Sequence, residues 1–210
     1  MLPVITIARQ FGSGGHEVGE KVAKKLGLPF FDKELIAMAA KKSGLSEEVF
    51  ADADEKATSS LLYSMVMGSY AFGARVPSIN EMPINDKLFI IQSDIIKKAA
   101  AEGPCVIIGR CADVILKDYH PLNLFIYADM EAKVERCIRR APEGEHLTRN
   151  EIERMIKQVD KNRAQYRQMY SDTKWGAKES YHLCVNTTER YMKEIVPGLA
   201  AYVRCWFSEE

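Results

Sequence analysis

The sequence predicts an α/β fold, a three-layer sandwich in which helices cover both faces of a five-stranded parallel sheet. Short apolar runs of strand length alternate along the chain with segments whose apolar residues recur at helical spacing. Strands that alternate with helices form parallel sheets, because each crossover helix covers one face. The 210 residues are 47% apolar, which is enough for one large core. We therefore expect a single domain over residues 1–210.

The strand candidates are the apolar runs Leu2–Ala8, Pro29–Phe31, Cys105–Ile108, Leu122–Ala128 and Tyr181–Val185. The helix candidates are Glu17–Leu26, Lys33–Lys42, Asp86–Ala101, Glu131–Arg139, Glu151–Tyr166 and Tyr191–Phe207. Thr148 and Glu151 have capping-box spacing, which predicts a helix start at this point. Asp129 is expected to cap the helix that follows the fourth strand. Pro197 should kink or split the last helix, because proline removes a helical hydrogen bond.

Two segments interrupt the alternation of strands and helices. Residues 44–84 begin with a run rich in Ser, Glu and Asp and continue with Met, Tyr and Gly. Residues 141–148 form a polar hinge between two predicted helices. Both segments are predicted to be mobile insertions on the sheet rather than separate domains.

Composition excludes several classes of protein. The 29 basic and 29 acidic side chains cancel, whereas a general nucleic-acid binder needs an excess of Lys and Arg. No run approaches the roughly 18–20 apolar residues that span a bilayer, and the N-terminus lacks the pattern of a signal peptide. The 5 cysteines are scattered, without the paired spacing of a zinc site. We expect a cytoplasmic protein with neither nucleic acid nor membrane as partner.

A glycine-rich segment lies between the first predicted strand and the first predicted helix. It contains Gly12, Ser13, Gly14 and Gly15, and His16 and Glu17 follow in the first helical turn. Glycines let backbone amides converge on an anion, and a helix N-terminus attracts negative charge, so the pattern favours a phosphate cradle over a simple tight turn. Neither GxxxxGK[ST] nor GxGxxG is matched, because the segment has no lysine and Glu17 occupies the third glycine position.

The residues around this loop resemble the start of the cytidylate kinases, in particular the branch whose loop reads RQFGSGG. The similar segments are Ile5–Gly27, Phe31-Asp32, Ile108-Gly109-Arg110, Arg139-Arg140, Asp160–Arg163 and Val185-Asn186-Thr187, in the same order as in the family. The resemblance covers nearly the whole chain. It implies a nucleoside-monophosphate-kinase fold, with residues 44–84 as the monophosphate-binding insertion and residues 141–170 as a helical lid. ATP with Mg²⁺ and a nucleoside monophosphate are the implied ligands.

Residues and resemblance together predict three groups of site residues. The catalytic candidates are Arg9, Arg139, Asp160 and Arg163. The nucleotide-binding candidates are Gly12, Ser13, Gly14, Gly15, His16 and Glu17. The acceptor-binding candidates are Asp32, Arg110, Asp113 and Arg167. Simpler interpretations remain open, since Asp32 and Glu17 suit helix caps and the arginines suit a solvated face.

The loop lysine of ordinary cytidylate kinases aligns with Gly15 here, so another cation must replace it. Arg9 at the end of the first strand is the nearest candidate, with Lys21 second. Arg110 follows a central strand, and ligands of α/β proteins bind at the carboxyl ends of such strands. Asp113 would stand in for a family aspartate that is Cys111 in this chain.

The predicted function is ATP-dependent phosphoryl transfer to a nucleoside monophosphate, with CMP or dCMP as the first choice. One alternative is a kinase of the same fold that acts on another small acceptor. A second is a nucleotide-binding regulatory module that lost catalysis together with the loop lysine. A dinucleotide-binding oxidoreductase is a third, and Glu17 in place of the third glycine argues against it.

Overall fold

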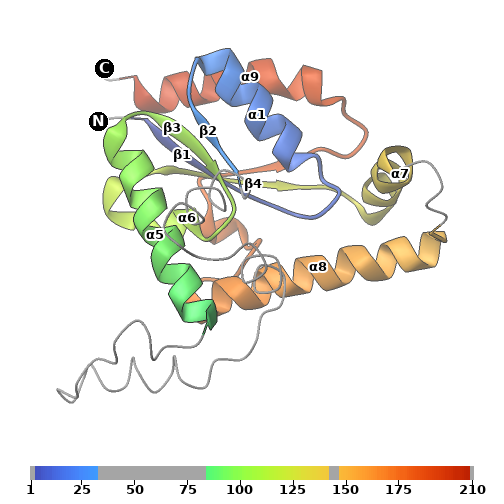
Figure 1. Cartoon of the computed structure of the whole chain (residues 1–210). Coiled ribbons are helices and arrows are strands. Elements are labelled where there is room, and N and C mark those ends of the chain that lie inside the picture. Colours follow the sequence, from blue (N-terminus) through green and yellow to red (C-terminus); the bar gives the residue numbers. More distant parts are fainter. Residues whose placement is uncertain (1–2, 33–83, 142–146, 209–210) are drawn as a thin grey trace.

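The computed structural model of the protein describes residues 3–32, 84–141 and 147–208. Its strands are β1 (Val4–Arg9), β2 (Phe30–Phe31), β3 (Cys105–Ile108), β4 (Leu122–Tyr127) and β5 (Leu183–Asn186). They form one sheet in the order β2-β3-β1-β4-β5, and every pairing is parallel (Figure 1). The predicted five-stranded parallel sheet is confirmed.

Strand β1 lies at the centre of the sheet and pairs with β3 on one side and β4 on the other. Val4 is opposite Cys105, and Ile5 is opposite Leu122. Both faces of β1 are covered, which explains why Val4, Ile5 and Ile7 are all apolar and buried. Thr6 is the one polar residue among them and is buried as well. Because parallel strands end at the same edge, the segments after β1, β3 and β4 meet there.

The helices are α1 (Gly15–Leu26), α5 (Ile84–Glu102), α6 (Ala112–Ile115), α7 (Met130–Arg140), α8 (Arg149–Tyr170) and α9 (Met192–Phe207), with short 3₁₀ turns at Lys117–Tyr119 and Lys178–Ser180. Helices α1 and α9 pack on one face of the sheet, where Val18 and Leu199 belong to the same buried cluster as Ile5 and Ile7. Helices α5 and α6 cover the opposite face (Figure 1). The predicted three layers are therefore present.

Helices α7 and α8 extend from the sheet and pack against each other. Val134 of α7 meets Ile152 and Ile156 of α8 in a small buried cluster, with Phe11 of the glycine loop at its border. The capping box predicted at Thr148 and Glu151 is formed, with Thr148 accepting from the Glu151 amide and Glu151 accepting from the Thr148 amide. The packing of α7 against α8 places the arginines of both helices around the loop.

Two details of the helices, at the start of α7 and inside α9, differ from the sequence predictions. Asp129 occupies the N-cap position of α7, but its side chain makes no capping hydrogen bond. Pro197 lies inside α9 without splitting it. Pro197 and Lys193, whose carbonyl loses a helical partner, are both exposed, so water can bond that carbonyl.

The predicted helix Lys33–Lys42, the predicted insertion at 44–84 and most of the predicted hinge at 141–148 lie outside the described residues. No helix of the described ranges is long and apolar enough to cross a membrane. All five cysteines are free thiols, and Cys105 and Cys111 are buried.

Candidate phosphate-binding site

A glycine-rich loop joins the central strand β1 to helix α1. Gly12 and Gly14 have left-handed backbone conformations, with φ of 72° and 77°, which residues with a Cβ adopt at a cost in energy. Gly14 is also the N-cap of α1, so the first amides of this helix open toward the loop. The amides at the start of α1 and the helix dipole together suit the binding of a phosphate group.

Arg136 of α7, a residue that sequence reasoning missed, holds the back of this loop. Its Nη1 donates to the Ser13 carbonyl at 3.2 Å, and its Nη2 donates to the Thr187 carbonyl at 2.5 Å. The Thr187 hydroxyl also donates to the Ser13 carbonyl, at 2.7 Å. The spacing of Lys133, Arg136 and Arg140 could have identified it, because residues three and four apart share a helix face. The loop carbonyls are thus fixed from behind.

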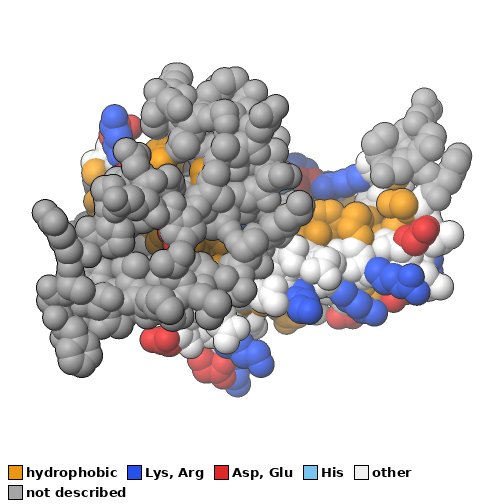
Figure 2. All heavy atoms as spheres, turned by 60° about the horizontal axis from the view of Figure 1, so that its bottom comes forward, with side chains coloured by type: hydrophobic (Ala, Val, Ile, Leu, Met, Phe, Trp, Pro, Cys, Tyr) orange, Lys and Arg blue, Asp and Glu red, His pale blue; other side chains and the backbone are white. Residues whose placement is uncertain are grey.

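A cavity of about 410 Å³ opens over the loop and is bordered by α7 and α8. Its cationic wall includes Arg9, Arg136, Arg140 and Arg163. Its apolar wall includes Ile138, Leu147, Ile152 and Met155. Figure 2 shows hydrophobic side chains gathered beside Lys and Arg side chains on this side of the molecule. The cavity therefore suits an anionic ligand with an apolar part.

Three arginines from different elements converge at one edge of the sheet. Arg9 ends β1, Arg110 follows β3, and Arg163 lies on α8. Burial, together with the charges of Arg163 and Arg110, lowers the pKa of Arg9 to about 9. Burial also lowers the pKa of Arg110. Cations that are this close and poorly hydrated destabilise one another, so the arrangement favours binding of an anion.

The side chain of Arg9 occupies the space beside Gly15. A Cβ atom at Gly15 would lie 2.5 Å from the Arg9 Cβ and 3.2 Å from the Ile126 Cβ. The guanidinium of Arg9 continues toward Gly109, where a Cβ would overlap its Nη1. The path of Arg9 is thus bordered by two glycines, and a lysine at position 15 could not coexist with it unless the backbone moved.

His16 and Asp32 form a pair at the mouth of the same cavity. The His16 Nε2 lies 3.1 Å from the Asp32 Oδ2, and the imidazole meets the edge of Phe30. His16 is half exposed and lines the cavity, whereas Asp32 follows the end of β2. Two residues predicted for different ligands, nucleotide and acceptor, are thus brought together.

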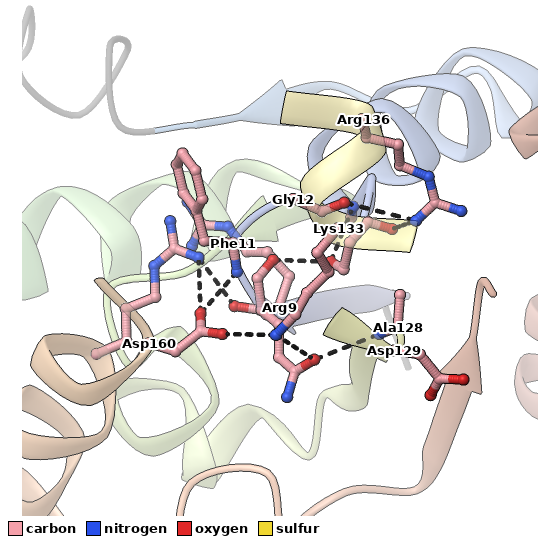
Figure 3. A network of polar contacts seen from close by, with 12 residues as sticks. Arg9, Phe11, Gly12, Ala128, Asp129, Lys133, Arg136 and Asp160 are labelled. Carbon is pink, nitrogen blue, oxygen red and sulfur yellow. Dashed lines mark hydrogen bonds and ion pairs between the residues drawn. The ribbon is translucent and has the colours of Figure 1, made fainter. Parts of the chain in front are cut away.

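Asp160 of α8 lies behind the loop, where it takes part in a network of polar contacts (Figure 3). Its Oδ1 accepts from the Phe11 amide at 2.6 Å, and its Oδ2 lies 3.1 Å from the Nζ of Lys133. Arg163, one turn later on α8, donates to the Arg9 carbonyl at 3.2 Å. Of these residues, Arg163 lines the cavity, but Asp160 and Lys133 do not.

In a comparison with known protein families, residues 4–189 match the cytidylate kinase-like family. The chain belongs to the cytidylate kinase-like family. This confirms the resemblance seen in the sequence, including its extent along the chain. None of the curated proteins compared with the chain matches it.

Solved structures with a similar fold include an uncharacterized protein and two shikimate kinases. An uncharacterized protein from Eubacterium ventriosum is 26% identical, with a TM-score of 0.71 and coverage of 98% of this chain and 99% of that one. Shikimate kinase from Bacteroides thetaiotaomicron is 14% identical, with a TM-score of 0.57 and coverage of 97% and 99%. Shikimate kinase from Acinetobacter baumannii is 15% identical, with a TM-score of 0.52 and coverage of 100% and 97%. The fold is that of a P-loop kinase, and family and fold together support nucleotide-dependent phosphoryl transfer.

Asp113 and Arg167 do not line the cavity of this cytidylate kinase-like protein. They form an ion pair with each other, with exposed side-chain fractions of 8% and 5%. Arg167 also donates to the carbonyl and the hydroxyl of Thr173 and lies over the ring of Tyr181. Both residues were expected to bind the acceptor, but the structure places them in a contact between α8 and α6.

Arg139 and Arg140, the arginine pair at the end of α7, differ in their position relative to the cavity. Arg140 lines the cavity and forms an ion pair with Glu17, whose other oxygen lies 2.5 Å from the Nζ of Lys21. The hydrogen bond from Lys21, followed by the charge of Arg140, lowers the pKa of Glu17. Arg139 is exposed and does not line the cavity. Lys21, the second candidate for the missing loop cation, is thus occupied by Glu17.

The carboxylates near the loop suit a magnesium ion that arrives with a nucleotide. Among the described residues, no group of three or more His, Cys, Asp or Glu side chains could hold a metal by itself. Mg²⁺ commonly takes one or two protein carboxylates, and phosphate oxygens and water complete its shell. Glu17 follows His16 in the first turn of α1, and the Asp32 Oδ2 lies 3.1 Å from the His16 Nε2. These two carboxylates are the candidates for an Mg²⁺ ion that is bound mainly by phosphates.

Proposed function

We propose that the protein transfers the γ-phosphoryl group of ATP to a nucleoside monophosphate, with CMP or dCMP as the first acceptor to test. The observation that carries the proposal is that Arg9 and Arg163 line the cavity over the glycine loop. The charge of Arg110, which does not line this cavity, also acts on Arg9. Phosphoryl transfer depends mostly on positioning and on neutralising charge, and this is what such an arrangement can supply.

In this proposal, an oxygen of the acceptor phosphate attacks the γ-phosphorus in line. The bond between this phosphorus and the β–γ bridging oxygen breaks, and ADP leaves. The loop amides and the start of α1 bind the phosphates of ATP, while Arg110 holds the acceptor phosphate. No general base is needed, since the acceptor phosphate is already anionic.

Arg9 takes the place of the loop lysine in this mechanism. Its side chain runs through the space that a side chain at position 15 would enter, so the positive charge enters from the strand rather than from the helix. Arg163 adds a second charge from α8. Charge that develops on the transferring group is stabilised most strongly by cations already held in place.

Glu17 and Asp32 are the proposed carboxylates for Mg²⁺. When bound, this ion supplies neutralisation of charge on the β- and γ-phosphates. For Glu17 to contribute, its pairs with Lys21 and Arg140 must open, and Arg140 can then turn to the phosphates. Arg140 is exposed enough to do so, with 60% of its side chain accessible.

A small hydroxyl compound is the second candidate acceptor. The pair of His16 and Asp32 favours it, because a carboxylate that orients an imidazole prepares it to take a proton. A hydroxyl acceptor loses a proton on transfer, whereas a phosphate acceptor does not. Shikimate, which is bound in one of the similar structures, is a useful representative of this class.

The experiment that tests the function is incubation of the purified chain with Mg²⁺-ATP and one acceptor at a time. The acceptors are CMP, dCMP, UMP, AMP, GMP and shikimate, and ³¹P NMR follows ADP and the phosphorylated product. With CMP as the acceptor, we expect ADP and CDP to form in equal amounts. Transfer to shikimate instead would favour the hydroxyl acceptor. ATP binding by calorimetry without transfer to any acceptor would contradict the proposal and favour the regulatory module.

A further inference from the structure

Lys133 is a lysine that is almost completely buried beside the glycine loop. Its side chain is 5% exposed and forms an ion pair with Asp160, which is 13% exposed. Its Nζ also donates to the Gln10 side-chain oxygen at 3.3 Å. Figure 3 shows its side chain extending from α7, below Gly12, toward Asp160 of α8.

A buried ion pair contributes little net stability to the contact between two helices. Removing two charges from water costs energy that their attraction only partly returns, and apolar side chains of similar size often stabilise such positions equally well. Helices α7 and α8 already have an apolar contact, formed by Val134, Ile152 and Ile156. Stability alone therefore does not account for the pair.

The pair has polar partners on both sides of the loop. Asp160 accepts from the Phe11 amide at 2.6 Å and so fixes the residue that precedes Gly12. The Gln10 oxygen that faces Lys133 also accepts from the Ala128 amide at 3.3 Å, at the end of β4. Arg163 lies 3.8 Å from this same oxygen of Asp160, Oδ1, and donates to the Arg9 carbonyl. The ion pair thus joins the loop, the end of β4 and the arginine that reaches the cavity from α8.

We propose that Lys133 and Asp160 act as positioning residues that set the shape of the glycine loop and the direction of Arg163. This inference rests on the proposed phosphoryl transfer and deepens it. Neither residue lines the cavity, so neither touches the phosphates directly. Lys133 compensates the charge of Asp160 behind the loop, and Asp160 then holds both the Phe11 amide and Arg163. Nucleotide phosphates meet a loop that is already in place.

Four variants and one control test the proposal. Lys133→Met and Asp160→Asn each break the pair, K133M/D160L removes both charges, and Lys133→Arg keeps the cation. Lys157→Met is the matched control, because it removes a lysine of α8 that forms an exposed pair with Glu153. The measurements are the melting temperature, kcat and KM for ATP, ADP affinity by calorimetry, and hydrogen exchange at the Phe11 amide.

We expect Lys133→Met and Asp160→Asn to have lower melting temperatures than the unmodified protein. Their kcat should fall by about 10- to 100-fold, since small displacements of the reacting groups have effects of this size. K133M/D160L should recover the melting temperature but not kcat, and its Phe11 amide should exchange faster. Lys133→Arg should retain most of the activity. Lys157→Met should change none of these quantities.

Two outcomes would overturn the proposal. Recovery of kcat together with the melting temperature in K133M/D160L would mean that the pair is only structural. Weaker ADP binding in Lys133→Met with unchanged Phe11 exchange would mean that Lys133 contacts phosphate directly. ADP affinity and amide exchange do not depend on the acceptor. The positioning role can therefore be tested even if no acceptor is phosphorylated and the proposed function fails.

Discussion

Arg9 and Gly15 depend on each other at the level of single side chains. An arginine at the end of β1 leaves no room for a side chain at position 15, where a Cβ would lie 2.5 Å from the Arg9 Cβ. A lysine at position 15 and the present position of Arg9 therefore exclude each other. In the proposed mechanism, Arg9 supplies the positive charge that a loop lysine would otherwise supply.

The first prediction exchanges these two residues. Arg9→Ala should slow the chemical step by about 10²–10³-fold, as loss of one preorganised charge commonly does, with a smaller effect on ATP affinity. Gly15→Lys alone should destabilise the fold by overlap with Arg9, whereas R9G/G15K should recover part of the rate. Single-turnover transfer from ATP measures all three. An unchanged rate in Arg9→Ala would exclude the role given to Arg9.

Gly14 is the loop residue whose substitution should affect stability as well as binding. It has φ of 77°, and a Cβ there would overlap the terminal methyl group of the buried Met192. Gly14→Val should therefore lower the free energy of unfolding by about 1–3 kcal/mol, measured by urea denaturation. Gly198→Ala in α9 is the control, because a Cβ there meets no atom within 4 Å and alanine favours a helix. Equal stability of Gly14→Val and the unmodified protein would show that the loop adapts.

Arg110 is expected to distinguish the two ligands. It follows strand β3, which neighbours the central strand, and has a left-handed backbone with φ of 59°, which is strained for a residue with a side chain. Arg110→Ala should weaken acceptor binding by about 1.5–3 kcal/mol, the value of a charge-assisted hydrogen bond, and ATP binding by less. Calorimetry with CMP and with ADP provides the comparison. Equal losses for both ligands would place Arg110 outside the acceptor site.

At the level of secondary-structure elements, α8 is attached to the rest of the molecule at several points. Asp160 bonds the loop, Arg163 bonds the end of β1, and Arg167 pairs with Asp113 of α6. The resemblance to cytidylate kinases predicts a lid over the whole of residues 141–170. These contacts lie in the second half of α8, so a lid movement that preserves them would be confined to the segment before Asp160.

Arg167→Met tests this attachment. Removing one partner of a buried ion pair leaves an uncompensated charge, so the free energy of unfolding should fall by about 3–5 kcal/mol, while KM for the acceptor should stay close to that of the unmodified protein. Lys178→Met, which removes a highly exposed partner of Glu179, should change stability by less than about 0.5 kcal/mol. A large rise in the acceptor KM with little loss of stability would restore the acceptor-binding role first expected of Arg167.

The sequence was sufficient to predict the elements but not all of their contacts. Cys105–Ile108 was placed to the residue, because an apolar run of strand length between helical patterns has few other interpretations. The glycine spacing likewise located the loop. Contacts between distant segments leave no such periodic signal. The spacing of Lys133, Arg136 and Arg140 indicates a shared face of α7, but it does not show what that face contacts. The pairing of Asp113 with Arg167 joins residues 54 positions apart.

At the level of the whole molecule, the fold concentrates positive charge although the net charge is zero. The 29 basic and 29 acidic side chains balance over the chain, yet the ends of β1 and β3 and the middle of α8 bring Arg9, Arg110 and Arg163 together. Parallel topology has this effect, because it directs successive strand ends to one edge. The folded protein is therefore expected to retain anion affinity that its composition does not suggest.

The last prediction follows from this concentration of charge. The lowered pKa of Arg9, about 9, is still above neutral pH, so Arg9 stays charged. Asp32 and Asp160 offset only part of the effect of burial and of the neighbouring arginines, so a bound anion should relieve the rest. Tripolyphosphate, which has the charge of the ATP phosphates but no base, should therefore raise the melting temperature at pH 7. The rise should shrink with added salt, because exposed parts of the site are screened. Arg149→Gln is the control, since Arg149 lies at the exposed start of α8 and pairs with Glu131. Tripolyphosphate should raise the melting temperature of Arg149→Gln as much as that of the unmodified protein, whereas the rise for Arg9→Ala should be smaller. A rise of equal size in Arg9→Ala would show that the loop amides bind the phosphates without this cluster of arginines.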